Sequence, residues 1–162
     1  MHPDLIVTLL ILLTAANGSP VIAKRVLGER FAWPIDGGLA LRDGRPLFGT
    51  SKTWRGLAAA VLATTVVAPL VGLTWQAGFA IGAAAMAGDL LSSFLKRRLG
   101  LKSSSQALGL DQVPESLLPQ LVVARTLGLT IPDMLGVTLL FFAGELIVSR
   151  VLFALHVRDR PY

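Results

Sequence analysis

The feature that most constrains this chain is a series of nearly unbroken apolar runs separated by polar stretches. An apolar run of about 20 residues is long enough to cross the hydrocarbon core of a bilayer as a helix. A helix on a soluble domain would instead repeat polar residues along one face. The hydrophobic content of 53% and the mean hydropathy of +0.66 support the membrane interpretation. The 162 residues therefore predict an all-α integral membrane protein, with a single domain over residues 1–162.

We expect five transmembrane helices, at about residues 4–23, 54–75, 78–97, 115–131 and 133–156. The first could be a cleaved signal peptide, but the chain opens Met-His-Pro-Asp and lacks the required basic start. We therefore expect a retained first helix. Its segment Asn17-Gly-Ser-Pro20 contains residues that break or kink helices. This segment is either a simple kink or part of a site, and we favour a site because Asn17 is costly at membrane depth.

The polar stretch at residues 34–56 is too rich in Gly and Pro to be a helix. Long loops of this kind are usually functional or disordered. It ends in Gly49-Thr-Ser-Lys-Thr53, a set suited to phosphate, because glycine exposes backbone N–H groups, hydroxyls donate and lysine adds charge. The full P-loop spacing is absent. We expect two long loops of this type to form a polar active-site cavity.

The third predicted helix carries Asp89, and an intramembrane carboxylate is by default a functional candidate. At helical spacing, Asp89 shares a face with Ser92 or Ser93 and with Lys96, although a purely structural Asp–Lys pair would look the same. The second loop then returns Asp111 to the membrane. Two carboxylates beside phosphate-binding cations indicate a Mg²⁺ site, since Mg²⁺ prefers oxygen ligands shared with phosphate.

The basic residues predict the topology. All of them except Arg125 lie in the first loop and its edges, in the second loop, or in the C-terminal region. Five helices place these three regions on one side, which the positive-inside rule assigns to the cytoplasm. We therefore expect a multi-pass protein of the cell membrane, with its N-terminus outside and its active site facing the cytoplasm. The net charge of +5 then reflects topology and anionic partners rather than nucleic acid.

Other polar residues receive structural interpretations. Arg125 either snorkels to the outer interface or pairs with an acid such as Glu145, and Glu145 is either a helix–helix contact or a lining residue. His2 and His156 lie at the ends of the chain and are expected to be inert. The small residues of the third helix serve either internal packing or a homodimer. The absence of cysteine excludes disulfides and thiolate metal sites.

Several short pieces of the chain together resemble one family, the CDP-archaeol synthases, which are relatives of the phosphatidate cytidylyltransferases. They occur in the family's order between about residues 17 and 112. The pieces are Asn17-Gly-Ser-Pro20, Pro34-Ile-Asp-Gly37, Asp43-Gly-Arg-Pro-Leu-Phe-Gly49, Ser51-Lys-Thr-Trp-Arg-Gly56, Gly88-Asp89, Ser93-Phe-Leu-Lys-Arg-Arg-Leu-Gly100 and Leu110-Asp-Gln112.

The resemblance implies a Mg²⁺-dependent cytidylyltransferase, in which CTP and a phosphorylated glycerol lipid give a CDP-lipid and pyrophosphate. By the same resemblance, Asp89 and Asp111 are the metal ligands. The implied catalytic phosphate-binding residues are Lys52, Arg55, Lys96 and Arg97. The implied substrate-binding residues are Asn17, Asp36, Asp43, Ser51, Thr53, Ser93 and Arg98.

The lipid itself is left open. Ser93-x-x-Lys96-Arg97 resembles the start of the signature of the diacylglycerol enzymes, whose later Gly-His-Gly-Gly part is missing, and this favours an archaeal-type ether lipid over phosphatidate. The chain departs from the family at Thr50, at Val113-Pro114 and in the uncharged segment of residues 103–107. A small anion transporter or scaffold is the alternative from another class, and it is disfavoured because a transport route needs polar groups at both membrane faces.

Overall fold

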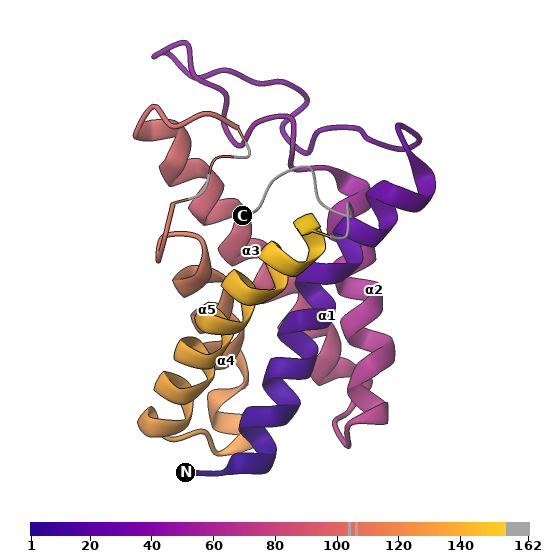
Figure 1. The fold of residues 1–162 in the computed structure, drawn as a ribbon, viewed down its shortest axis with the longest axis vertical. Helices are drawn as coiled ribbons and strands as arrows, with labels where there is room; N and C mark the ends of the chain where they lie inside the picture. Colours follow the sequence, from indigo (N-terminus) through magenta and orange to yellow (C-terminus); the bar gives the residue numbers. More distant parts are fainter. Residues whose placement is uncertain (104, 106, 155–162) are drawn as a thin grey trace.

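The structure is a computed structural model that describes residues 1–103, 105 and 107–154. The expectations for His156 and for the basic residues Arg158 and Arg160 lie outside the described residues. Five helices form an elongated bundle (Figure 1). The helices are α1 (Pro3–Leu27), α2 (Trp54–Leu70), α3 (Trp75–Arg98), α4 (Gln112–Leu127) and α5 (Ile131–Ala154). The all-helical prediction is confirmed, and within the described residues the only strand-like pairing is two isolated bridges.

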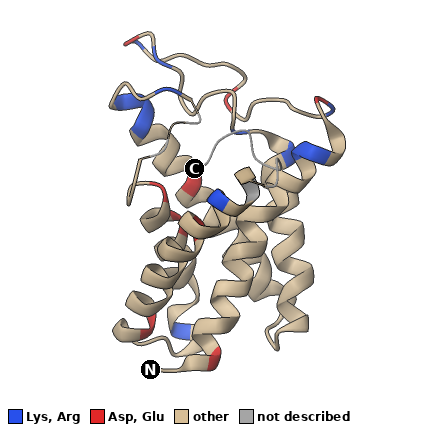
Figure 2. Ribbon diagram, viewed as in Figure 1, with Lys and Arg blue, Asp and Glu red and all other residues tan. Residues whose placement is uncertain are grey.

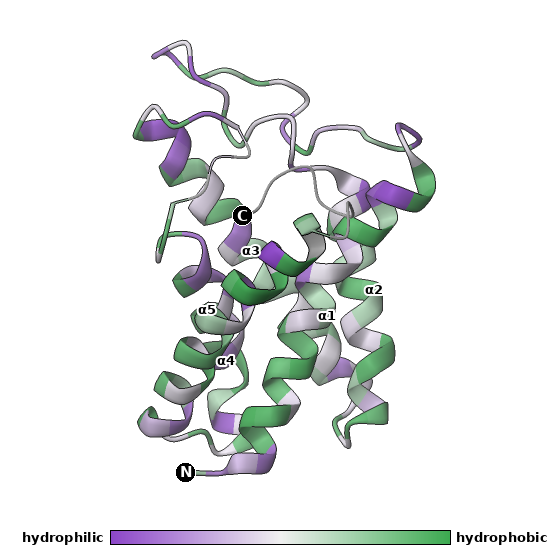
Figure 3. Ribbon diagram, viewed as in Figure 1, coloured by the Kyte–Doolittle hydropathy of each residue, from purple (hydrophilic) through white to green (hydrophobic). Residues whose placement is uncertain are grey.

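Both long loops lie at the same end of the bundle, opposite the N-terminus (Figure 1). The first loop comprises residues 28–53 and the second comprises residues 99–111. Most Lys and Arg residues lie at this end, while the shafts of the helices are mostly apolar (Figures 2 and 3). This arrangement agrees with the charge pattern that predicted the two loops to be together.

Three helices are long and apolar enough to cross a membrane: Pro3–Leu27, Trp75–Arg98 and Ile131–Val151. The apolar helix α2 has 17 residues and α4 has 16. At 1.5 Å per residue these two are about 24–26 Å long, slightly less than the hydrocarbon core. The existence of five helices is therefore confirmed, and their crossing as five full spans stays a prediction.

Two sequence-based boundaries were wrong. The helix α1 continues through Gly18 and Pro20 to Leu27, so the expected interruption is absent from the helix. Trp75 begins α3 and does not end α2, because the hydroxyl of Thr74 accepts the N–H of Ala77 and caps α3 at that point. The turn between the two helices lies at residues 71–74, a few residues before the position predicted from the sequence.

Glycines let α3 pack closely on its neighbours. A Cβ atom on Gly78 would lie 2.4 Å from the carbonyl oxygen of Thr64 in α2, and one on Gly88 would lie 2.4 Å from the carbonyl oxygen of Pro114 in α4. The small face of α3 is therefore used for internal packing. This explains the small residues without a dimer, and the homodimer stays a prediction.

The first loop is an ordered structure of turns closed by two antiparallel bridges, Pro34 with Thr53 and Ala40 with Pro46. The carboxylate of Asp36 accepts the N–H groups of Gly38, Phe48 and Gly49 at 2.9–3.0 Å. Burial alone would raise the pKa of Asp36, but these N–H donors outweigh it and hold the pKa below its ordinary value. Asp36 therefore organises the loop in its ionised form.

The other end of the bundle is closed by a contact between the N-terminus and α5. The backbone N–H of His2 lies 2.6 Å from Oδ1 of Asp133, and the His2 ring nitrogen Nδ1 lies 2.8 Å from Oδ2. Asp133 is fully buried and also accepts from Thr130. His2, expected to be inert, thus makes a structural contact that joins α1 to α5.

Candidate active site

A central cavity of about 860 Å³ lies between the two loops and the halves of the helices nearest to them. It is bounded by α1, the first loop, the start of α2, α3, the second loop, the start of α4 and the end of α5. Most of the charged and polar residues predicted for the site line it. These are Asn17, Ser51, Lys52, Thr53, Arg55, Asp89, Ser93, Lys96, Arg97 and Asp111.

The first ion pair of the cavity joins the first loop to α3. Nζ of Lys52 lies 2.6 Å from each carboxylate oxygen of Asp89, and the two side chains are 21% and 27% exposed. The backbone of Lys52 is positioned by a bond from its N–H to Gly49 and by a bond from the N–H of Ile35 to its carbonyl. Burial alone would lower the pKa of Lys52, but the charge and hydrogen bond of Asp89 raise it above its ordinary value. The Lys52 side chain therefore carries a positive charge in the folded protein.

The second ion pair joins α3 to the second loop. Nζ of Lys96 lies 2.6 Å from Oδ1 of Asp111 and donates to the carbonyl of Ser105 at 3.0 Å. The other carboxylate oxygen of Asp111 accepts the N–H of Ala107 at 2.9 Å. The predicted face of Asp89, Ser93 and Lys96 does point into one cavity, and Asp111 reaches the same cavity from the loop.

Two arginines of the cavity also hold the loops in place. Arg55 donates to the carbonyl oxygens of Gly28 and Arg30 at 2.7 and 2.6 Å. Arg97 donates through Nη2 to the carbonyl of Lys102 at 2.7 Å, and its buried Nε has no hydrogen-bond partner within the described part of the chain. Arg97 can therefore accept a further anionic ligand in the cavity without breaking its contact with the loop.

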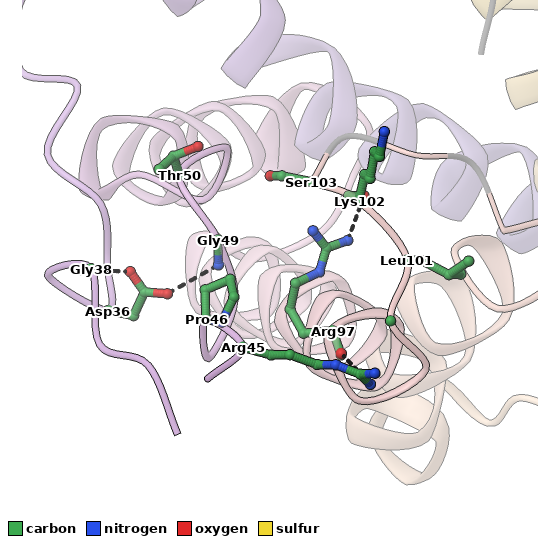
Figure 4. A pocket seen from close by; sticks show the side chains of 11 residues that line it. Asp36, Gly38, Arg45, Pro46, Gly49, Thr50, Arg97, Leu101, Lys102 and Ser103 are labelled. Atoms are coloured by element: carbon green, nitrogen blue, oxygen red, sulfur yellow. Dashed lines mark hydrogen bonds between the residues drawn. The ribbon is translucent and has the colours of Figure 1, made fainter. Parts of the chain in front are cut away.

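A smaller pocket of about 360 Å³ opens between the two loops (Figure 4). It shares Thr50, Arg97 and Ser103 with the central cavity. Figure 4 shows the guanidinium of Arg97 between Lys102 and Ser103, with Arg45 running below it. Arg45 donates to the carbonyl of Arg98 at the end of α3. The two spaces are thus neighbours on either side of Arg97.

The comparisons with known proteins point to one family. The family model for CarS-like CDP-archaeol synthases matches residues 4–162. A CDP-archaeol synthase of Sulfurisphaera tokodaii is 33% identical over 153 residues, which cover 91% of this chain and 89% of that protein.

The chain belongs to the CDP-archaeol synthase family.

A CDP-archaeol synthase of Hyperthermus butylicus is 43% identical over 105 residues, and this match covers 61% of the chain and 60% of that relative. The chain thus spans about 60% of the length of this relative and of a CDP-archaeol synthase of Pyrococcus furiosus. A solved structure of an intramembrane enzyme for archaeal membrane lipids biosynthesis matches with a TM-score of 0.67 and 31% identity, covering 86% of this chain and 91% of that one. This match and the apolar helices indicate that this CDP-archaeol synthase family member is a membrane protein with the same fold as the solved structure.

Three residues predicted to bind substrate have mainly loop contacts in this family member. Asp36 binds backbone N–H groups of the first loop, and it lines the smaller pocket rather than the central cavity. Asp43 pairs with Arg98 at 2.6 Å, and Arg98 also donates to the carbonyl of Pro46. These contacts fasten the first loop to the end of α3, and substrate contacts of the three residues stay a prediction.

The hydroxyls predicted for phosphate are divided between two tasks. Thr53 caps α2 by accepting the N–H of Gly56 at 3.2 Å. Ser51 is bonded to the hydroxyl of Ser103 at 3.2 Å, across the two loops.

Asn17 lines the cavity, and its buried Nδ2 has no hydrogen-bond partner among the described residues. Asn17 is thus a donor available to a ligand even though α1 is continuous around it.

The sequence analysis missed Glu115 as a site residue. Glu115 lies in the first turn of α4, is 4% exposed and lines the cavity. Its Oε1 has no hydrogen-bond partner within the described part of the chain. The sequence analysis treated Glu115 only as the first residue of the fourth helix. The signal that could have identified it is its position directly after Val113-Pro114, where the chain departs from the family pattern. The cavity is also lined by Glu145.

Proposed function

We propose that this protein transfers CMP from CTP to a phosphorylated glycerol lipid of the archaeal ether type, releasing pyrophosphate. The observation that carries the proposal is the convergence of Asp89 and Asp111 with Lys52, Lys96 and Arg97 in one cavity at the loop end of a membrane bundle. Membership of the CDP-archaeol synthase family supports the same reaction. The loop end lies in the cytoplasm in this proposal, so that CTP reaches the cavity directly.

The reaction needs positioning and charge neutralisation more than acid–base chemistry, because a lipid phosphate is already an ionised nucleophile. An oxygen of the lipid phosphate attacks the α-phosphorus of CTP, the bond from that phosphorus to the bridging oxygen breaks, and pyrophosphate leaves. Lys52, Lys96 and Arg97 bind the phosphates and offset their charge. The lipid chains stay in the bilayer and reach the cavity sideways between helices.

Mg²⁺ fits the donor set of the cavity. Asp89 and Asp111 offer hard oxygen ligands on neighbouring elements, and Mg²⁺ commonly needs only one or two carboxylates with waters and substrate phosphates. Among the described residues, no three acidic or histidine side chains converge at metal-binding distance, so phosphate oxygens would complete the ligand set. When bound, Mg²⁺ would supply charge neutralisation at the phosphates.

The test is a turnover assay with purified protein, labelled CTP, Mg²⁺ and either geranylgeranyl ether phosphate or phosphatidate. We expect a CDP-lipid from the ether substrate. Product from phosphatidate alone would retain the chemistry and reject the ether lipid. No product from either lipid would reject the enzyme proposal and favour an anion transporter or scaffold.

The variant Asp89→Asn should abolish turnover while the protein stays folded, because it keeps the size of the side chain and removes its charge. We expect a loss of at least about 100-fold, the scale at which a positioned charge acts in catalysis. Asp4→Asn is the matched control, since Asp4 is exposed in the first turn of α1. Near-normal turnover in Asp89→Asn would remove Asp89 from the reaction.

A further inference from the structure

Each candidate metal ligand is already held by a lysine. Lys52 lies 2.6 Å from both oxygens of Asp89, and Lys96 lies 2.6 Å from one oxygen of Asp111. A divalent cation binds carboxylate oxygens at about 2.0–2.5 Å. An ammonium and a metal ion on the same two oxygens would repel each other strongly at that separation. Binding of a cation at Asp89 therefore requires Lys52 to move.

The two lysines differ in how firmly they are held. Lys96 has a second partner, the carbonyl of Ser105, and its side chain is 10% exposed. Among the described residues, Lys52 has only Asp89 as a side-chain partner, and its side chain is 21% exposed. Its backbone is fixed in the loop while its four-carbon stem is flexible. Lys52 can leave its carboxylate without disturbing the loop.

We propose that Lys52 acts as an exchangeable cation on Asp89: it neutralises the carboxylate in the nucleotide-free site and transfers to the nucleotide phosphates when a divalent cation takes Asp89. The proposal rests on the proposed function only in that Asp89 binds a divalent cation. An ionised carboxylate left unpaired in a partly buried cavity is costly, and the pair with Lys52 removes that cost before a cation binds. The lysine that neutralises Asp89 is then the group delivered to the phosphates.

This exchange couples two binding events. A divalent cation alone must displace Lys52 and leave the ammonium without a partner, so it binds weakly. Nucleotide phosphates accept the displaced ammonium, so each ligand strengthens the binding of the other by the same factor.

The experiment measures Mn²⁺ affinity without CTP, from the loss of the electron paramagnetic resonance signal of free Mn²⁺. Mn²⁺ takes the same oxygen ligands as Mg²⁺. We expect Lys52→Met to bind Mn²⁺ about tenfold more tightly than the wild type, because its competitor for Asp89 is gone. Asp89→Asn should lose this binding.

The matched control is Lys102→Met, which removes the same charge from the rim of the adjoining pocket. Within the described part of the chain, the ammonium of Lys102 contacts no carboxylate. We expect its Mn²⁺ affinity to stay within about twofold of the wild type, since long-range charge is screened. An unchanged or weaker affinity in Lys52→Met, or an equal gain in both variants, overturns the exchange.

A second measurement leaves Lys52 in place. The four lysines are Lys24, Lys52, Lys96 and Lys102. After reductive ¹³C-methylation each gives a separate methyl signal in nuclear magnetic resonance, and the Lys52 signal is assigned by its absence in Lys52→Arg. Adding Mg²⁺ and CTP together should move the Lys52 signal and not the Lys102 signal, and a stationary Lys52 signal overturns the proposal.

These outcomes separate the two proposals. Wild-type turnover with no gain of Mn²⁺ affinity in Lys52→Met rejects the exchange and leaves the reaction in place. A wild type that binds no Mn²⁺, with or without CTP, rejects both the exchange and the metal site. A gain of Mn²⁺ affinity in Lys52→Met, together with a wild type that turns over neither lipid, supports the exchange and rejects the reaction.

Discussion

Among single residues, Glu115 is notable because it is a buried acid of the central cavity in addition to the two aspartates that pair with lysines. Lys52 pairs with Asp89 and Lys96 pairs with Asp111, whereas Oε1 of Glu115 has no hydrogen-bond partner in the described part of the chain. A buried carboxylate in this state costs folding free energy. Such residues persist where function requires them, at the expense of stability.

The variant Glu115→Gln tests this reading of Glu115. It keeps the side-chain size and replaces the buried acid by a neutral amide, so we expect the free energy of unfolding to rise by about 1–3 kcal/mol. We expect turnover to fall, because an acid that lines the cavity with Asp89 and Lys52 is lost from the site. Thermal unfolding in detergent and the CTP turnover assay measure the two effects. A stability loss with unchanged turnover would show that Glu115 is purely structural.

Asp36 gives the first loop a predicted pH dependence. Because its pKa in the folded protein lies below the ordinary value, the carboxylate stabilises the folded loop above that ordinary value. The stabilisation is lost as the pH falls from about 4 through the lower folded pKa, where the carboxylate takes up a proton.

We therefore expect the first loop to loosen selectively under acid conditions. Fluorescence of Trp33 and Trp54, which flank the bridge at Pro34 and Thr53, reports the change. Asp36→Asn should show the loosened signal already at pH 7. An identical acid transition in wild type and Asp36→Asn would assign the pH dependence to other groups.

At the scale of elements, α3 organises the bundle and the site together. It packs on α2 at Gly78 and Gly82 and on α4 at Gly88, where added Cβ atoms would clash with atoms of the neighbouring helices. The contact at Gly88 is with Pro114 and the Cα atom of Glu115. This close approach places the first turn of α4 beside Asp89, so a packing residue determines where an acid of the cavity stands.

Gly88→Ala should therefore destabilise the bundle. The added Cβ would lie 2.4 Å from the carbonyl oxygen of Pro114, and we expect a loss of about 1–3 kcal/mol in the free energy of unfolding, with a fall in turnover. Gly144→Ala in α5 is the control, because its Cβ would meet no atom within 4 Å. The control should be neutral or stabilising by up to about 1 kcal/mol. Equal effects of both variants would contradict close α3–α4 packing.

In the whole molecule, the two loops and most of the described Lys and Arg residues lie at one end of the bundle (Figures 1 and 2). Arg125 lies in the last turn of α4, and no ion pair between Arg125 and Glu145 occurs within the described residues. Glu145 lines the cavity instead. The end of the molecule that carries the two loops is thus strongly basic, and by the positive-inside rule we propose that it faces the cytoplasm.

This orientation can be measured directly because the chain contains no cysteine. Arg42→Cys places one thiol on the first loop, and Gln76→Cys places one at the start of α3, at the opposite end; both positions are exposed. On intact cells, a membrane-impermeant maleimide should label Gln76→Cys and spare Arg42→Cys until the cells are opened. The reverse pattern would invert the proposed topology.

The class of the molecule and the number of helices could be read from the sequence alone, and most of the site residues predicted from it do line the cavity. Apolar runs of membrane length have few alternatives to helices, because backbone polar groups in lipid must bond within the segment. The helical period also placed Asp89, Ser93 and Lys96 on one face, since that relation depends only on spacing along one element.

Which charges meet depends on the packing of the folded chain. Lys52 and Asp89 are 37 residues apart, so no local period relates them. Asp36 and Arg98 were implied to bind substrate by the family resemblance, but in the folded protein their polar atoms also have backbone partners in the first loop. Glu115 became a cavity residue because Gly88 lets α4 approach α3. Pairings between distant segments depend on how whole helices pack, and that is the information a single sequence does not carry.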